Sequence, residues 1–145
     1  MKVARENLRI VLIDDGENDR ELLEAALAEA GFMLPLTHYD DAGMALAYFK
    51  YMNAKGSLGP HLILLDINMP PIDGIHALRL LREEPATRDL PVIILTGTED
   101  PEQRRKLTKL GIFRFLKKLP DCANVIAALD DFIGFYNHQD TSSAT

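Results

Sequence analysis

Short apolar runs alternate with longer segments of helical period along most of the chain. The runs of strand length are 8–13, 34–39, 61–65, 91–95 and 112–116. The segments between them repeat apolar residues every three to four positions, as amphipathic helices do. This alternation is typical of βαβ units and predicts an α/β fold with a parallel sheet.

The composition of the runs predicts their places in that sheet. Residues 8–13, 61–65 and 91–95 are almost continuously apolar, as expected for strands that helices cover on both faces. Residues 34–39 and 112–116 include polar side chains, which suits sheet edges. We therefore expect the first, third and fourth strands in the middle and the other two at the edges.

Five helices are expected between and after these strands. Their apolar stripes are Leu22, Leu23, Ala26, Leu27 and Ala30; Ala45, Leu46, Phe49 and Met52; Ile75, Leu78 and Leu81; Leu107 and Leu110; and Val125, Ile126, Leu129, Phe132, Ile133 and Tyr136. Asp40 or Asp41 is expected to cap the second helix, and Thr98 or Asp100, with Pro101, to start the fourth. The fourth helix has the least to bury, so it should be the least firmly anchored.

The length of 145 residues suits one domain, which the pattern places at 8–136, followed by a polar tail at 137–145 without regular structure. No apolar run approaches the roughly 20 residues of a membrane span, so no membrane partner is expected. Cys122 is the single cysteine, which excludes an intramolecular disulfide and favours a reducing, cytoplasmic location. The net charge of -6 argues against nucleic-acid binding, which depends on basic side chains.

Polar and charged side chains follow four of the expected strands. They are Asp14 and Asp15, Asp66, Thr96, and Lys117 and Lys118. Parallel strands joined by right-handed crossovers bring their carboxyl ends to one edge, where we expect these groups to meet. Three carboxylates that close together need a cation to stay charged, and oxygen ligands suit Mg²⁺.

Each residue also has a purely structural interpretation. Asp14 and Asp15 could cap the first helix, Asp66 could begin a turn, Thr96 could be a strand-end hydroxyl, and Lys118 could be a solvated charge. Taken singly, the structural interpretation is the better one. The coincidence at four strand ends favours a functional site.

With these residues in place, the chain resembles the receiver domains of two-component response regulators over about 8–136. The matching motifs are Asp14-Asp15, the segment DINMPPIDG (66–74), Thr96, and the spaced set Gly111, Phe115 and Lys118. This spacing selects Lys118 over Lys117. The resemblance implies a flavodoxin-like (βα)5 fold, a doubly wound parallel five-stranded sheet with strand order 2-1-3-4-5.

The resemblance also implies that Asp66 accepts a phosphoryl group from a sensor histidine kinase or a phosphotransfer protein. Carboxylates are known nucleophiles in such transfers. Asp14, Asp15, Asp66 and the backbone carbonyl of Asn68 would hold Mg²⁺, and Lys118 would pair with a phosphoryl oxygen. The chain would be a signalling domain and not an enzyme.

A conformational switch is implied as well. Thr96 would donate its hydroxyl to the phosphoryl group, and Phe115 would fill the space that Thr96 leaves. This would change the surface of the fourth helix, fifth strand and fifth helix, which would bind an unidentified downstream protein or a second copy of the chain. Basic residues of the fourth helix and Asp130 and Asp131 could pair across a two-fold axis. Phe115 as an ordinary core aromatic is the alternative.

Some residues depart from the family pattern, and other functions remain open. Gly16 follows the acid pair, and Leu119 stands where the family usually has proline. One alternative is a Mg-dependent aspartyl phosphohydrolase with Asp66 as nucleophile, disfavoured because Asn68 replaces its acid/base aspartate. Another is an interaction module that works without phosphorylation. The four histidines lack ligand spacing and are expected to be packed or solvated.

Overall fold

The computed structural model describes residues 2–14, 17–56, 58–67, 74–97, 100–117 and 122–143, without the side chains of 17–19 and 140–143. Strands and helices alternate throughout. They are β1 (Arg9–Ile13), α1 (Glu17–Glu29), β2 (Thr37–Tyr39), α2 (Ala42–Ala54), β3 (His61–Asp66), α3 (Gly74–Glu83), β4 (Val92–Thr96), α4 (Pro101–Leu110), β5 (Arg114–Lys117) and α5 (Cys122–Ser143).

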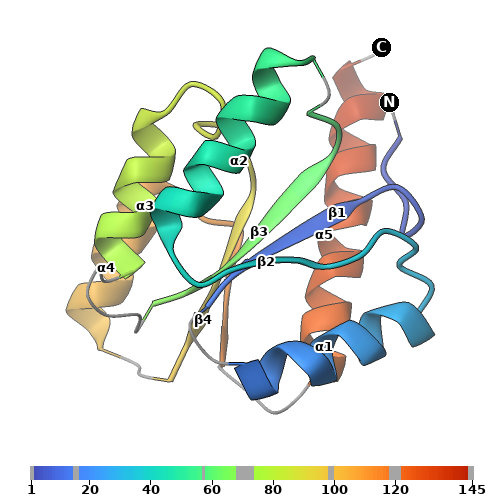
Figure 1. Ribbon diagram of the computed structural model, residues 1–145, viewed down its shortest axis with the longest axis horizontal. Helices are drawn as coiled ribbons and strands as arrows, with labels where there is room; N and C mark the ends of the chain where they lie inside the picture. Colours follow the sequence, from blue (N-terminus) through green and yellow to red (C-terminus); the bar gives the residue numbers. More distant parts are fainter. Residues whose placement is uncertain are drawn as a thin grey trace.

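All strand pairs are parallel, and the sheet has the order β2-β1-β3-β4-β5, as the sequence predicted. The sheet runs between two groups of helices, α1 and α5 on one side and α2, α3 and α4 on the other (Figure 1). The three central strands are almost entirely buried, whereas β2 and β5 are half-exposed. The predicted division into central and edge strands is therefore confirmed.

Alternating side chains of each central strand fill two separate cores. Val11 and Ile13 of β1 pack against α2, α3 and α4, while Ile10 and Leu12 pack against α1 and α5. This is why these strands are apolar at consecutive positions: each face of the sheet has its own hydrophobic layer to fill. Regular pairing then leaves the strand ends as the place where polar side chains can gather.

The structure decides between the alternative helix starts. Asp41 is the N-cap of α2, and its carboxylate accepts hydrogen bonds from the backbone N–H groups of Gly43 and Met44. Asp100 is the N-cap of α4, directly before Pro101. Of the residues of α4, all of which are described, only Leu107 is fully buried, in agreement with the expectation that this helix buries little.

The chain before β1 packs on the last helix, which the sequence pattern did not predict. Val3 is buried, and its backbone exchanges two hydrogen bonds with the side chain of Asn137, at 2.9 and 2.8 Å. Arg5 binds the Asp130 carboxylate through its Nε at 2.9 Å and lies over the Phe32 ring. This segment lies beside the C-terminal half of α5 (Figure 1), so packing extends beyond the range 8–136.

Two further details differ from the expected pattern. α5 continues to Ser143 and enters the segment 137–145, for which a tail without regular structure was expected. No glycine or proline after Gly134 interrupts that helix. Leu22 was assigned to the buried stripe of α1 but is 57% exposed, because Leu23 occupies the position that faces the sheet.

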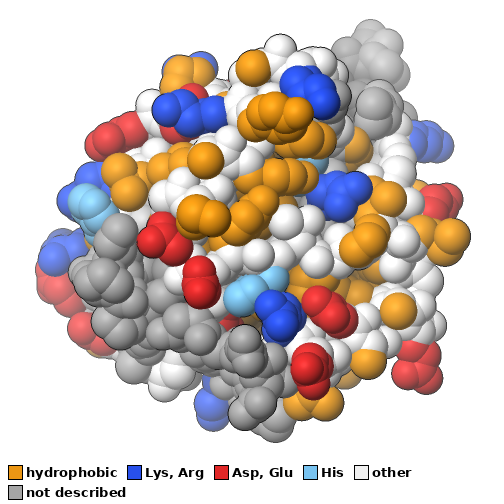
Figure 2. Space-filling view, in the orientation of Figure 1, with side chains coloured by type: hydrophobic (Ala, Val, Ile, Leu, Met, Phe, Trp, Pro, Cys, Tyr) orange, Lys and Arg blue, Asp and Glu red, His pale blue; other side chains and the backbone are white. Residues whose placement is uncertain are grey.

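Apolar side chains are also found on the surface. They gather over α2 (Figure 2), where Met44 and Tyr51 are each 60% exposed. Phe135 of α5 is exposed too, as its place off the apolar stripe predicted. Within the described part of the chain, no helix is both long and apolar enough to cross a bilayer.

Candidate functional site

Asp14 and Asp66 lie side by side at the carboxyl edge of the sheet. The β1–β3 register pairs Ile13 with Leu65. Asp14, which follows β1, therefore lies beside Asp66, the last residue of β3. Neighbouring strands are about 4.8 Å apart. Both aspartates are buried, with 1% and 0% of their surface exposed. Two central strands thus bring two acids together below the surface.

Thr96 reaches the same edge as the last residue of β4, which pairs with β3. Like the two aspartates, Thr96 is buried. The sequence prediction that these three residues share one edge is borne out by the strand register. Asp15, Asn68 and Lys118 lie outside the described residues, so their expected places remain predictions.

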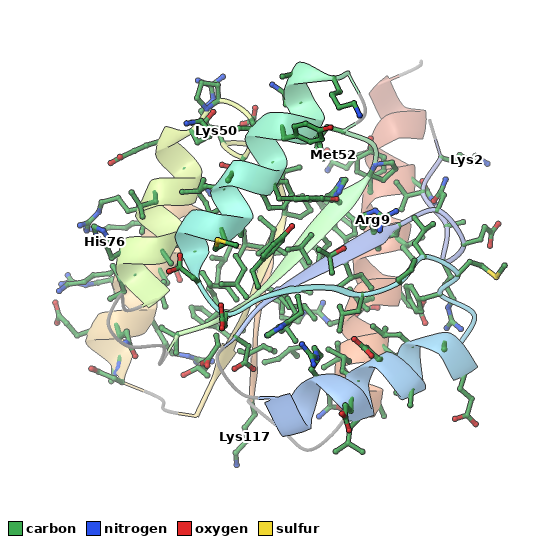
Figure 3. All side chains as sticks on the ribbon, in the orientation of Figure 1. Lys2, Arg9, Lys50, Met52, His76 and Lys117 are labelled. Atoms are coloured by element: carbon green, nitrogen blue, oxygen red, sulfur yellow. The ribbon has the colours of Figure 1, made fainter. Side chains whose placement is uncertain are left out.

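Lys117 ends the edge strand β5, where it pairs with Thr96 in the strand register. Its side chain is exposed and points away from the sheet (Figure 3). A lysine in this orientation is a solvated charge and does not neutralise the buried acids. The choice of Lys118 as the family lysine stays a prediction.

The donor set at this edge suits a hard divalent cation. Two neighbouring buried carboxylates repel each other as like charges, and a cation between them relieves this repulsion. Oxygen ligands and a site with few protein donors fit Mg²⁺, which retains several waters. Among the described residues no group of three His, Cys, Asp or Glu side chains could hold a metal. Asp15 and Asn68, the other expected oxygen donors, lie outside the described residues.

Gly74, the first residue of α3, contacts the backbone of Ile67 just after β3. Its N–H donates a 2.8 Å hydrogen bond to the carbonyl of Ile67, so α3 begins directly against the end of β3. A Cβ at position 74 would lie 2.4 Å from the Cα of Ile67. Only glycine permits this approach of two backbones, which explains the final glycine of the segment DINMPPIDG.

Comparison with known proteins identifies the family. A family model described as the response regulator receiver domain matches residues 10–130. The chain belongs to the response regulator receiver domain family. It is 31% identical over 134 residues to a probable chemotaxis protein CheY from Rhizobium etli, a match that covers 92% of this chain and 98% of the relative.

A second relative is a longer protein. The chain is 32% identical over 128 residues to the DNA-binding transcriptional regulator NtrC of Salmonella typhimurium, covering 88% of this chain but 25% of that protein. Among solved structures, a response regulator receiver protein from Pseudomonas putida has a TM-score of 0.72 and 25% identity, covering 89% of this chain and 99% of the other. Both comparisons agree with the receiver assignment.

On this receiver domain, Phe115 links β5 to α4. Its ring is half-buried and packs against the core beneath α2, α3 and α4. The guanidinium carbon of Arg104 lies 4.5 Å from the ring centroid, within the range of a cation–π contact. This contact was not predicted, because no spacing in the sequence signals it.

Arg82 of α3 anchors the C-terminal end of α4. Its guanidinium donates to the carbonyls of Leu110 at 3.2 Å and Gly111 at 2.7 Å, and to three carbonyls of the turn after α3, those of Thr87, Arg88 and Leu90. Burial lowers the pKa of Arg82, and nearby Asp89 opposes this effect. These hydrogen bonds hold the C-terminal end of α4 in addition to the burial of Leu107. The sequence did not predict them.

We expect Arg82→Met to lower the free energy of unfolding by about 2 kcal/mol, because hydrogen bonds from a charged donor are among the strong ones. Methionine keeps the apolar stem and removes only the donors. Urea unfolding measures the loss, and amide exchange should rise at Gly111 and Ile112. Arg79→Met, at an exposed position of the same helix, is the control. Equal losses in the two variants would contradict the anchoring role.

Proposed function

We propose that this receiver accepts a phosphoryl group on Asp66 from a phosphohistidine of a sensor histidine kinase or a phosphotransfer protein. The observation that supports this most is the pairing of two buried acids, Asp66 and Asp14, at the ends of adjacent central strands. Burial keeps bulk water away from the acceptor, and the strand fixes its position. Membership of the receiver family supports the same role.

In the proposed step, a carboxylate oxygen of Asp66 attacks the phosphorus atom. The new O–P bond forms as the P–N bond to the donor imidazole breaks, and the imidazole nitrogen takes up a proton. When bound, Mg²⁺ would neutralise charge that develops on the phosphoryl oxygens. Asp14, Asp15, Asp66 and the carbonyl of Asn68 would hold the ion, and Lys118 would pair with a phosphoryl oxygen.

The proposed response begins at Thr96. Its hydroxyl would donate to the arriving phosphoryl group and draw in the connection between β4 and α4. Phe115 would then move towards the vacated space, which requires the contact between Arg104 and the ring to change. The changed surface of α4, β5 and α5 would control binding of a downstream protein. The hydrogen bonds from Arg82 would hold the C-terminal end of α4 in place during this change.

A homodimer through the same surface is a further part of the proposal. From the sequence, Asp130 and Asp131 could pair with basic residues of the fourth helix of another copy. In the structure, Asp130 binds Arg5 and Asp131 binds Arg114 at 2.7 Å. A dimer would have to share or replace these ion pairs, which are exposed and therefore worth little. Sedimentation with and without a phosphate analogue measures this directly.

Beryllofluoride, a phosphoryl analogue, tests the proposal on the whole chain. With Mg²⁺ present, ¹⁹F NMR should detect bound beryllofluoride, and amide exchange of residues 97–117 should change. Without Mg²⁺, no bound signal should appear. A folded protein that gives no bound signal with Mg²⁺ would contradict the proposed site. Steady turnover of an aryl phosphate would instead favour a phosphohydrolase.

A further inference from the structure

His38 of β2 connects the backbone of Asp14 to α1. Its Nε2 lies 2.6 Å from the Asp14 carbonyl oxygen, and its Nδ1 lies 2.9 Å from a guanidinium nitrogen of Arg20. A carbonyl can only accept a hydrogen bond and a guanidinium can only donate one. These contacts fit the tautomer with its hydrogen on Nε2, in which Nε2 donates to the Asp14 carbonyl and Nδ1 accepts from Arg20.

The contact between His38 and the Asp14 carbonyl lies at the end of the β1–β2 ladder. The N–H of Asp14 donates to the Tyr39 carbonyl at 3.0 Å. Beyond Tyr39, β2 ends, and Asp41 turns to cap α2. A carbonyl on a buried residue such as Asp14 needs a donor, and the His38 side chain provides one. Both backbone polar groups of Asp14 are thus held by β2.

Arg20 extends the link across the connection from β1 to α1. It lies in the first half of α1, on the far side of Asp15 from Asp14. Its guanidinium is also 3.9 Å from Glu24 of the same helix. The chain of contacts from Arg20 through His38 to Asp14 therefore fixes the two ends of the segment that contains Asp15.

We infer that His38 and Arg20 are positioning residues for the acidic pair, setting the backbone from which Asp14 and Asp15 meet a divalent cation. This inference rests on the proposed phosphoacceptor site and adds residues from β2 and α1 to it. Neither side chain needs to touch the cation. Partners that orient metal ligands without binding the metal typically contribute a factor of about 10 to 100 in affinity.

The test is the affinity of the full chain for Mg²⁺, measured by NMR titration of backbone amides. His38→Leu removes both hydrogen bonds and should weaken Mg²⁺ binding about tenfold. His38→Gln should restore most of the affinity, since its amide can donate to Asp14 and accept from Arg20. Arg20→Met should weaken binding by a smaller factor. It provides a second test if His38→Leu does not fold.

His61→Leu is the matched control. This imidazole is also bonded at both nitrogens, to the Tyr48 hydroxyl at 2.9 Å and the Gly59 carbonyl at 2.8 Å, but at the opposite end of the sheet. The folded variant should bind Mg²⁺ as the parent does. In the parent, ¹⁵N NMR of the His38 ring should show the hydrogen on Nε2.

The outcomes separate the inference from the proposed function. If the parent binds Mg²⁺ and His38→Leu and Arg20→Met bind it equally well, the positioning role is wrong while the site stands. Equal weakening in His61→Leu would also overturn the role, because it would reflect general destabilisation. A hydrogen found on Nδ1 would overturn the hydrogen-bond assignment. If the folded parent binds no Mg²⁺, the proposed site fails and this inference fails with it.

Discussion

Asp66→Asn should accept no phosphoryl group from a small acyl phosphate such as acetyl phosphate, and it should remain folded. The amide has nearly the shape of the carboxylate but is not a nucleophile for phosphorus. Because Asp66 lies beside buried Asp14, the change also removes a repulsion between like charges. In the absence of Mg²⁺ the variant should therefore be at least as stable as the parent.

Phosphoryl transfer is measured by intact-mass spectrometry, and stability by urea unfolding. Asp89→Asn is the control, because this acid is exposed in the turn between α3 and β4 and should be phosphorylated like the parent. An Asp66→Asn protein that is modified as fast as the parent would show that the acceptor is another residue. A large loss of stability would show that the buried carboxylate has a structural role instead.

Gly74→Ala should lower the free energy of unfolding by about 3 kcal/mol, at the upper end of the usual cost of overpacking. The added Cβ would lie 2.4 Å from the Cα of Ile67, and a backbone atom cannot rotate away as a side chain can. Either α3 or the end of β3 must shift. Since Asp66 directly precedes Ile67, we also expect weaker Mg²⁺ binding.

Gly134→Ala in α5 is a matched control with the opposite expected sign. A Cβ there meets no atom within 4 Å, and alanine is favoured over glycine inside a helix by about 1 kcal/mol. Urea unfolding of both variants gives the comparison. If Gly74→Ala were as stable as the parent, the close approach between α3 and β3 would not constrain the site.

The sheet and the edge that carries the site could be predicted because both follow from local signals. Continuous apolar runs identify central strands, and parallel crossovers require their carboxyl ends to share one edge. These two signals are enough to group Asp14, Asp66 and Thr96 at one edge of the sheet. Their register, which places Asp14 directly beside Asp66, came from the structure.

Contacts made through single polar side chains could not be predicted. Asn137 bonds the backbone of Val3, which is 134 residues away, and no periodicity marks such a pair. Arg82 binds carbonyls at the end of another helix. Its place in the last turn of α3 was the only available signal, since basic residues favour helix C-termini. No sequence signal distinguished His38 from the other three histidines, because its partners are a side chain of α1 and a backbone carbonyl.

The most direct test of the account is to locate the phosphoryl group in the chain. The parent protein is treated with Mg²⁺ and acetyl phosphate, the acyl phosphate is trapped by borohydride reduction, and tandem mass spectrometry identifies the modified residue. We predict modification at Asp66 that disappears when Mg²⁺ is removed. Modification at any other residue, or none in a folded protein with Mg²⁺ present, would contradict the assignment of Asp66 as the phosphoacceptor.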